Sequence, residues 1–158
     1  MKTSQTMLLR NGQKLGYAEY GAPNGRPVFF FHGFPGSRLE AAYVEDRLAS
    51  LNARFLAINR PGMGLSDYQK NRSILDFPDI VFELARHLEL DKFAVLGISG
   101  GGPYALACAY KIPSKLLLGC GVVSGTGNYA INKEGLNQNN QRLLFIAKHF
   151  SWIVRLLL

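Results

Sequence analysis

Hydrophobic residues gather in short runs over residues 1–130, and polar, glycine-rich segments separate these runs. Runs this continuous are typical of strands that are buried on both faces of a sheet. Four of them predict strands at residues 28–31, 54–58, 93–96 and 115–123. Two more strands are expected at 7–10 and 14–20, because Asn11-Gly12 between them favours a tight hairpin turn.

Helical patterns lie between the predicted strands. The pair Ser37 and Glu40 matches a capping box, which predicts a helix that begins there and ends at about Leu51. Val44 and Leu48 fall on the apolar face of this helix together with Leu51. Two further helices are predicted at residues 76–89, with an apolar stripe of Ile80, Leu84 and Leu88, and at residues 104–110.

The alternation of strands and helices indicates the fold class. Strands that are joined through helices pair as parallel neighbours, so the sequence predicts an α/β fold with a mostly parallel, doubly wound sheet. Functional sites in such sheets lie at the carboxyl ends of the strands. Glycine-rich loops follow three predicted strands, at residues 32–37, 60–67 and 97–102. We therefore expect a functional site where these loops meet.

Composition narrows the class of partner. The chain has 158 residues, of which 47% are hydrophobic and 18% are charged, as in a globular domain. The formal net charge is +7, but Lys and Arg are scattered singly and form no phosphate-binding stripe. We therefore expect a small-molecule partner and no nucleic acid. Residues 1–10 lack the apolar core of a signal peptide, so the expected location is cytoplasmic.

The cysteines do not indicate a metal site. Cys108 lies in a predicted helix and Cys120 in a predicted strand, without the spacing of metal ligands. Both are expected to be buried and reduced, and we expect no bound metal ion.

The segment Gly97-Ile98-Ser99-Gly100-Gly101 carries the most specific chemical signal. A G-x-S-x-G sequence between a strand and a helix is typical of a nucleophile elbow, a sharp turn that projects the serine hydroxyl outward. Glycines on both sides leave room for the turn, and the serine is expected in a strained backbone conformation. The start of the following helix favours negative charge that develops near the serine.

A dinucleotide-binding loop is the rival interpretation of residues 97–102. That motif needs a glycine where Ser99 stands, and an acidic residue about 20 positions later to bind the ribose. Residues 114–126 contain no acidic residue. The nucleophile elbow is therefore the preferred interpretation.

Two further motifs carry a family resemblance. With the loops H-G-F-P-G at residues 32–36 and R-P-G-M-G-L-S-D at 60–67, the elbow resembles the N-terminal portion of the α/β-hydrolase family. The likeness covers about residues 8–130 and is nearest to the cofactor-free serine esterase, lipase and peptidase branch.

The resemblance implies a role for each motif. Ser99 would be the nucleophile, and the backbone amides of Phe34 and Gly100 would form the oxyanion hole. His32 would orient the oxyanion loop and would not act as the base, and residues 60–67 would support the site. The implied reaction cleaves an ester or related acyl bond of an apolar substrate through an acyl-enzyme, with no cofactor.

A base and an acid are harder to find in this sequence. The family order is serine, then acid, then histidine, and only Glu134 and His149 follow Ser99. Both fit a lid better than a triad, because the family's pair follows later strands of the sheet, and His87 fits a solvated helix position. We therefore expect a truncated hydrolase that lacks its acid and base and leaves strand 115–123 at an edge of the sheet.

The domain organisation follows from the same comparison. Residues 1–130 are predicted to form the N-terminal part of the hydrolase core, and residues 131–158 to begin a helical lid. The stretch 143–158 is apolar on most faces, yet shorter than the ~20 residues that span a bilayer. Because Trp152 and nearby cations suit a headgroup boundary, an interfacial membrane helix is the second interpretation.

A different class of function stays open. A hydrolase remnant without catalysis could bind an apolar ligand or a partner chain. A fluorophosphonate probe separates the two hypotheses, because it labels an activated Ser99 and not an unassisted serine.

Overall fold

The computed structural model describes residues 2–127, 138 and 141 of the chain. The chain divides into two compact units, Met1–Thr126 and Gly127–Leu158, and every element below belongs to the first. The expected lid helix at 143–158 and the alternative triad residues Glu134 and His149 lie outside the described residues.

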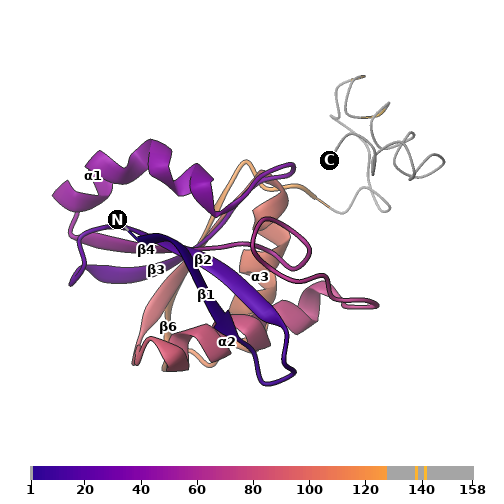
Figure 1. Cartoon of the computed structure of the whole chain (residues 1–158). Coiled ribbons are helices and arrows are strands. Elements are labelled where there is room, and N and C mark those ends of the chain that lie inside the picture. The colour runs from indigo at the N-terminus through magenta and orange to yellow at the C-terminus, as the bar shows by residue number, and fades with distance from the viewer. Residues whose placement is uncertain (1, 128–137, 139–140, 142–158) are drawn as a thin grey trace. The chain divides into compact units, whose positions relative to one another are not determined.

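Six strands form one sheet in the order β1-β2-β4-β3-β5-β6 (Figure 1). The strands are β1 (Lys2–Leu8), β2 (Lys14–Gly21), β3 (Arg26–Phe31), β4 (Ala53–Ile58), β5 (Phe93–Ile98) and β6 (Leu117–Val123). The helical elements are η1 (Arg38–Val44), α1 (Glu45–Ser50), η2 (Ile74–Asp76), α2 (Phe77–His87), η3 (Ser99–Gly101) and α3 (Gly102–Lys111), where η marks a 3-10 helix.

Strand directions confirm the predicted fold class. Pairing is parallel from β4 through β3 and β5 to β6, while β2 is antiparallel to both β1 and β4. The predicted hairpin joins β1 and β2, although β1 begins at Lys2, well before the expected residues 7–10. Gly12 takes a positive φ of 79° in the turn, and its N–H donates to the carbonyl of Leu9.

Both faces of the sheet are covered, as a doubly wound sheet requires. Phe29 and Phe31 point to the face packed by α2 and α3, whereas Phe30 points to the face packed by η1 and α1. Figure 1 shows α1 and α2 on opposite sides of the sheet. All three phenylalanines are fully or almost fully buried, and each such side chain contributes roughly 1.5–3 kcal/mol.

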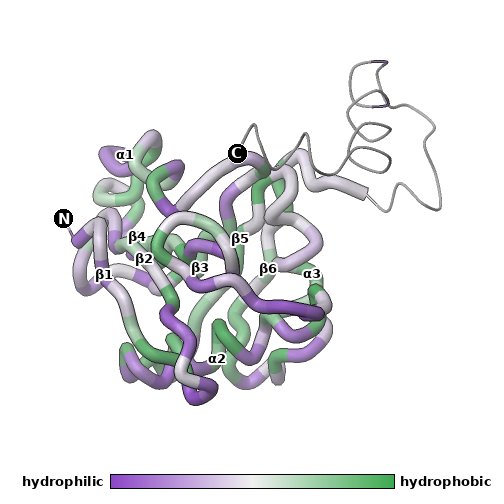
Figure 2. Tube along the Cα trace, turned by 45° about the vertical axis from the view of Figure 1, so that its right-hand side comes forward, coloured by the Kyte–Doolittle hydropathy of each residue, from purple (hydrophilic) through white to green (hydrophobic). Residues whose placement is uncertain are grey.

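Helix α2 confirms the predicted apolar stripe. Ile80 and Leu84 are buried against the sheet, and Leu88 is partly buried where the helix ends. Hydrophobic and hydrophilic residues alternate along this helix in Figure 2. Pro78 stands in the first turn, where the proline ring costs no internal hydrogen bond.

The prediction of a single helix from Ser37 to Leu51 is wrong. A 3-10 helix, η1, is followed by the short helix α1, and Leu51 is exposed. Ser37 Oγ accepts the N–H of Leu39 as a cap, but Glu40 does not complete the capping box. Its carboxylate instead accepts the N–H of Gly33, in the loop after β3. Glu40 therefore binds the backbone of the preceding loop instead of capping its own helix.

Strand β6 forms an edge of the sheet within the described residues. Leu118, Val122 and Val123 are exposed there. Cys108 is buried as predicted, but Cys120 is exposed, so the expectation for Cys120 is wrong. The reason is its position on the edge strand, where neighbouring chain covers Cys120 only in part.

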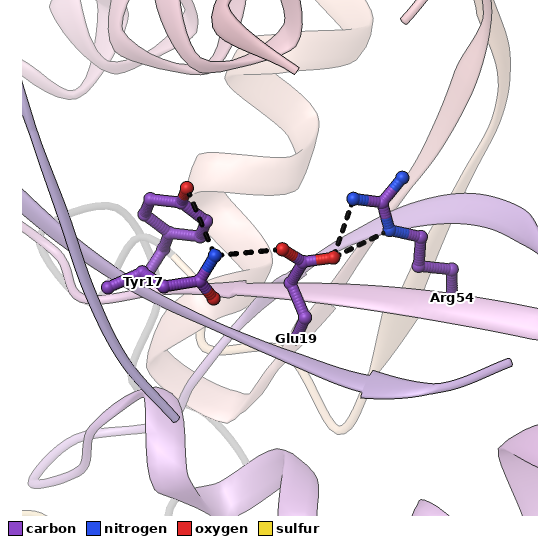
Figure 3. Close-up of polar contacts among 4 residues, drawn as sticks. Tyr17, Glu19 and Arg54 are labelled. Atoms are coloured by element: carbon purple, nitrogen blue, oxygen red, sulfur yellow. Dashed lines mark hydrogen bonds and ion pairs between the residues drawn. The ribbon is translucent and has the colours of Figure 1, made fainter. Parts of the chain in front are cut away.

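A polar cluster ties the first strands together (Figure 3). Gln5 Nε2 donates to Glu19 Oε1 at 2.9 Å and to the Tyr17 hydroxyl at 3.3 Å, and Arg54 Nε donates to Glu19 Oε2 at 2.8 Å. Burial alone raises the pKa of Glu19, but the hydrogen bonds from Gln5 and Arg54 outweigh it and lower that pKa. The cluster fixes the pairing of β1, β2 and β4 away from the glycine-rich loops.

Candidate active site

The segment from β5 to α3 forms a sharp elbow around Ser99. Ser99 has a positive φ of 48°, which is unfavourable for a residue with a side chain, so the strain predicted at this position is present. A Cβ at Gly97 would overlap the carbonyl oxygen of Gly101, and a Cβ at Gly101 would overlap that of Phe31. Both glycines are therefore needed for α3 to turn back so closely on β5 and β3.

The loop after β3 lies against this elbow. An ideal Cβ built on Gly33 would be 3.6 Å from Ser99 Cβ. One built on Gly100 would be 3.4 Å from the backbone nitrogen of Phe34. The fold thus brings Ser99, Phe34 and Gly100, the residues singled out from the sequence, into one place. Their chemical roles stay predictions.

His32 holds the loop after β3 and is fully buried. Its Nδ1–H donates to the carbonyl of Gly33 at 2.8 Å, and its Nε2 accepts the N–H of Arg60 at 3.2 Å. Burial and the nearby charge of Arg60 lower the pKa of His32 to about 4, so the ring is neutral at pH 7. Because both ring nitrogens are occupied by backbone groups, His32 positions the loop, in agreement with the predicted role.

Arg60, at the end of β4, contacts both halves of the site. Its Nη2 donates to the carbonyl of Gly33 at 2.6 Å, and its Nη1 donates to that of Gly100 at 3.1 Å. The residue is only 5% exposed. Burial lowers the pKa of this guanidinium, and Tyr104, whose ring lies 5.0 Å from Arg60 Cζ, has the opposite effect. The sequence placed Arg60 in a supporting loop and gave no sign of this bridge.

Two more contacts fix the surroundings of the elbow. The carboxylate of Glu40 accepts the N–H of Gly33 at 2.9 Å, a role that the capping-box prediction missed. The N–H of Thr126 donates to the carbonyl of Ser99 at 3.0 Å. The only sequence signal for Glu40 was its position three residues after Ser37, and helix capping explained that signal.

The loop at 60–67 is fastened to β2, as its expected supporting role requires. Asp67 Oδ2 accepts the N–H of Lys14 at 2.7 Å, and Ser66 Oγ accepts that of Gly16 at 2.9 Å. Asp67 is thereby tied to β2.

No side chain among residues 2–127 hydrogen-bonds the hydroxyl of Ser99. His32 is committed to the backbone, and His87 is exposed on α2. The same described part of the chain holds no cluster of three or more potential metal ligands. It also holds no helix that is long and apolar enough to cross a membrane.

Known proteins resemble this chain in sequence and in structure. An uncharacterized hydrolase of Saccharomyces cerevisiae is 28% identical over 131 residues, which are 82% of this chain and 43% of the yeast protein. An esterase from Exiguobacterium antarcticum superposes with a TM-score of 0.70 at 21% identity, over 96% of this chain and 57% of the esterase. The epoxide hydrolase CorEH superposes with a TM-score of 0.74 at 23% identity, over 98% of this chain and 54% of the enzyme.

The chain therefore spans about half the length of these relatives. The alpha/beta hydrolase fold family itself matches residues 26–150, which include the loop at 32–36, the loop at 60–67 and the elbow. The chain belongs to the alpha/beta hydrolase fold family.

Proposed function

We propose that the protein carrying this chain is a serine hydrolase that cleaves an ester or related acyl bond through an acyl-enzyme at Ser99. The observation that carries this proposal is the strained Ser99, φ 48°, on a turn packed against the backbone of Phe34. Backbone strain at a nucleophile elbow persists where the surrounding structure requires it, and it exposes the hydroxyl to a substrate.

The chemistry proceeds in two stages. The Ser99 hydroxyl attacks the acyl carbon while its proton passes to a general base, and the amides of Phe34 and Gly100 hold the oxyanion that forms. Collapse of this intermediate expels the alcohol, which takes the proton, and leaves the acyl group on Ser99. Water then repeats the sequence and releases the acid. No cofactor takes part in these steps.

The general base and its acid belong to polypeptide outside the described residues. Two observations support this placement: His32 and Asp67 are committed to backbone groups, and the relatives are about twice as long as this chain.

The acyl substrate is proposed to be apolar and small. The side chain of Phe34 is 51% exposed beside the elbow, and an aromatic ring in that position favours an apolar acyl group. Residues 143–158 would add the apolar cover of a lid, although they lie outside the described residues.

A non-catalytic remnant that binds an apolar ligand is the second candidate. The absence of a hydrogen-bond partner for the Ser99 hydroxyl among residues 2–127 favours it. A serine without a base is unreactive towards electrophilic phosphonates, so reactivity distinguishes the two functions.

The test is labelling by a fluorophosphonate probe, in the 158-residue chain and in any longer polypeptide that contains it. An active form should be labelled, and Ser99→Ala should abolish the label. Ser124→Ala is the matched control, because Ser124 also has a positive φ, 46°, and is more exposed. Unlabelled wild-type protein in every form would favour the remnant.

A further inference from the structure

We propose that Arg60 is a positioning residue for the oxyanion hole, one that joins the two segments bearing the Phe34 and Gly100 amides and strengthens the first of these donors. This inference rests on the proposed function, because it assigns Arg60 a part in the same reaction.

The guanidinium spans two separate parts of the fold. Nη2 donates to the carbonyl of Gly33, in the loop after β3, and Nη1 donates to that of Gly100, in the elbow after β5. A planar guanidinium presents its donors in a rigid fork, so the two bonds fix the separation of the carbonyls that accept them. An oxyanion hole needs this kind of fixation, because its two amides must reach the same oxygen atom.

The Gly33 carbonyl has a further property. It is the other end of the peptide group whose N–H belongs to Phe34. A cation that hydrogen-bonds a peptide oxygen draws electron density from the nitrogen, so the N–H becomes a stronger donor. His32 donates to the same oxygen at 2.8 Å, which adds a neutral bond to the charged one at 2.6 Å from Arg60.

The positive charge of Arg60 is not neutralised by direct contact. No carboxylate among residues 2–127 forms an ion pair with Arg60, although the residue is only 5% exposed. The carboxylate of Glu40 accepts the N–H of Gly33 in the same loop, and its charge raises the pKa of Arg60 without forming an ion pair, although burial outweighs this effect. A buried cation without a carboxylate in direct contact is costly for the fold, so its presence between the two segments that bear the amides calls for a functional reason. Negative charge that forms in the hole supplies one.

The ring of Tyr104 on α3 packs against the guanidinium of Arg60. Arg72 contacts the same ring and therefore serves as a control. Arg60 Cζ lies 5.0 Å from the centre of the Tyr104 ring, and Arg72 Cζ lies 5.3 Å from it. Within the described part of the chain, Arg72 makes no hydrogen bond to the loop after β3, and its Nη2 instead donates to the Tyr104 hydroxyl at 3.0 Å. The two arginines share an aromatic neighbour, but only Arg60 bonds the carbonyls of the site.

The experiment compares Arg60→Gln and Arg60→Lys with Arg72→Gln in a form that hydrolyses p-nitrophenyl butyrate. Losing one oxyanion donor costs roughly 10²–10³ in rate, so misaligning two retained donors should lower kcat by about 10–100-fold with KM changed less than about 3-fold. Affinity for an alkyl boronic acid, which forms a tetrahedral anion on serine, should fall by the same factor. Arg72→Gln should change each quantity by less than about 3-fold.

The possible results separate the positioning role of Arg60 from the proposed function itself. A folded Arg60→Gln protein with the boronate affinity of Arg72→Gln would overturn the positioning role and leave the serine hydrolase intact. If Arg60→Gln does not fold, Arg60→Lys decides: it keeps the charge but not the fork, and unchanged kcat there overturns the inference. Hydrolysis that survives in Ser99→Ala would remove both the proposed function and the role of Arg60.

Discussion

At the scale of the residue, the site depends on side chains whose polar atoms are committed to the backbone. His32 and Arg60 are both buried, and together they place three hydrogen bonds on the carbonyls of Gly33 and Gly100. These bonds hold the two segments that bear the amides of Phe34 and Gly100. The chemistry proposed for Ser99 therefore rests on neighbours that do not react themselves.

The burial of His32 predicts a pH dependence of stability. The pKa of His32 is about 4 in the folded chain, against 6.5 for an unperturbed histidine, so between these values the unfolded chain binds more protons. The neutral His32 ring therefore contributes fully to the stability of the fold above pH 6.5. As the pH falls from 6.5 to 4, the free energy of unfolding decreases by on the order of 3 kcal/mol. Urea unfolding at several pH values measures this decrease in the free energy of unfolding.

Two variants make the interpretation specific. His32→Gln should lower the free energy of unfolding at pH 7 and remove this part of the pH dependence. His87→Gln changes an exposed histidine and should retain the dependence in full. If the free energy of unfolding of His32→Gln depends on pH between 4 and 6.5 as strongly as that of the wild type, groups other than His32 cause the dependence.

At the scale of the element, close approach between backbones determines the geometry of the elbow. A Cβ at Gly101 would overlap the carbonyl oxygen of Phe31, which is held in the centre of the sheet. We expect Gly101→Ala to lower the free energy of unfolding by about 2 kcal/mol or more, because rigid backbone cannot move aside. Gly119→Ala is the matched control: no atom lies within 4 Å of the added methyl, and stability should change by less than about 0.5 kcal/mol. Equal effects of the two substitutions in thermal or urea unfolding would contradict the account.

The strands and helices could largely be predicted from the sequence, whereas contacts between distant loops could not. Strands β3, β4 and β5 and the elbow follow from local apolar runs and from G-x-S-x-G, because these signals depend on neighbouring residues. The partner of Glu40 could not be predicted in this way. Its carboxylate satisfies a local pattern at Ser37, yet it binds the N–H of Gly33, and only the folded chain decides between these partners. The Arg60 bridge is of the same kind, since it joins loops that are distant in sequence.

At the scale of the whole molecule, the described part of the chain supplies a candidate nucleophile and two candidate amide donors, but no side chain that could act as the base of Ser99. Among the residues that the structure describes, the sheet ends at β6, where Leu118 and Val123 are exposed. The chain spans about half the length of its relatives. A serine, a base and an acid act as one unit, so activity should appear only where all three are present.

The most direct test of the central claim is to trap an acyl-enzyme. A form of the protein that contains this chain and hydrolyses p-nitrophenyl butyrate is quenched within one turnover, digested and analysed by mass spectrometry. The account predicts a burst of p-nitrophenol and a butyryl group on the peptide that carries Ser99, both lost in Ser99→Ala and retained in Ser124→Ala. Hydrolysis without a burst, or a butyryl group on a residue other than Ser99, would contradict it.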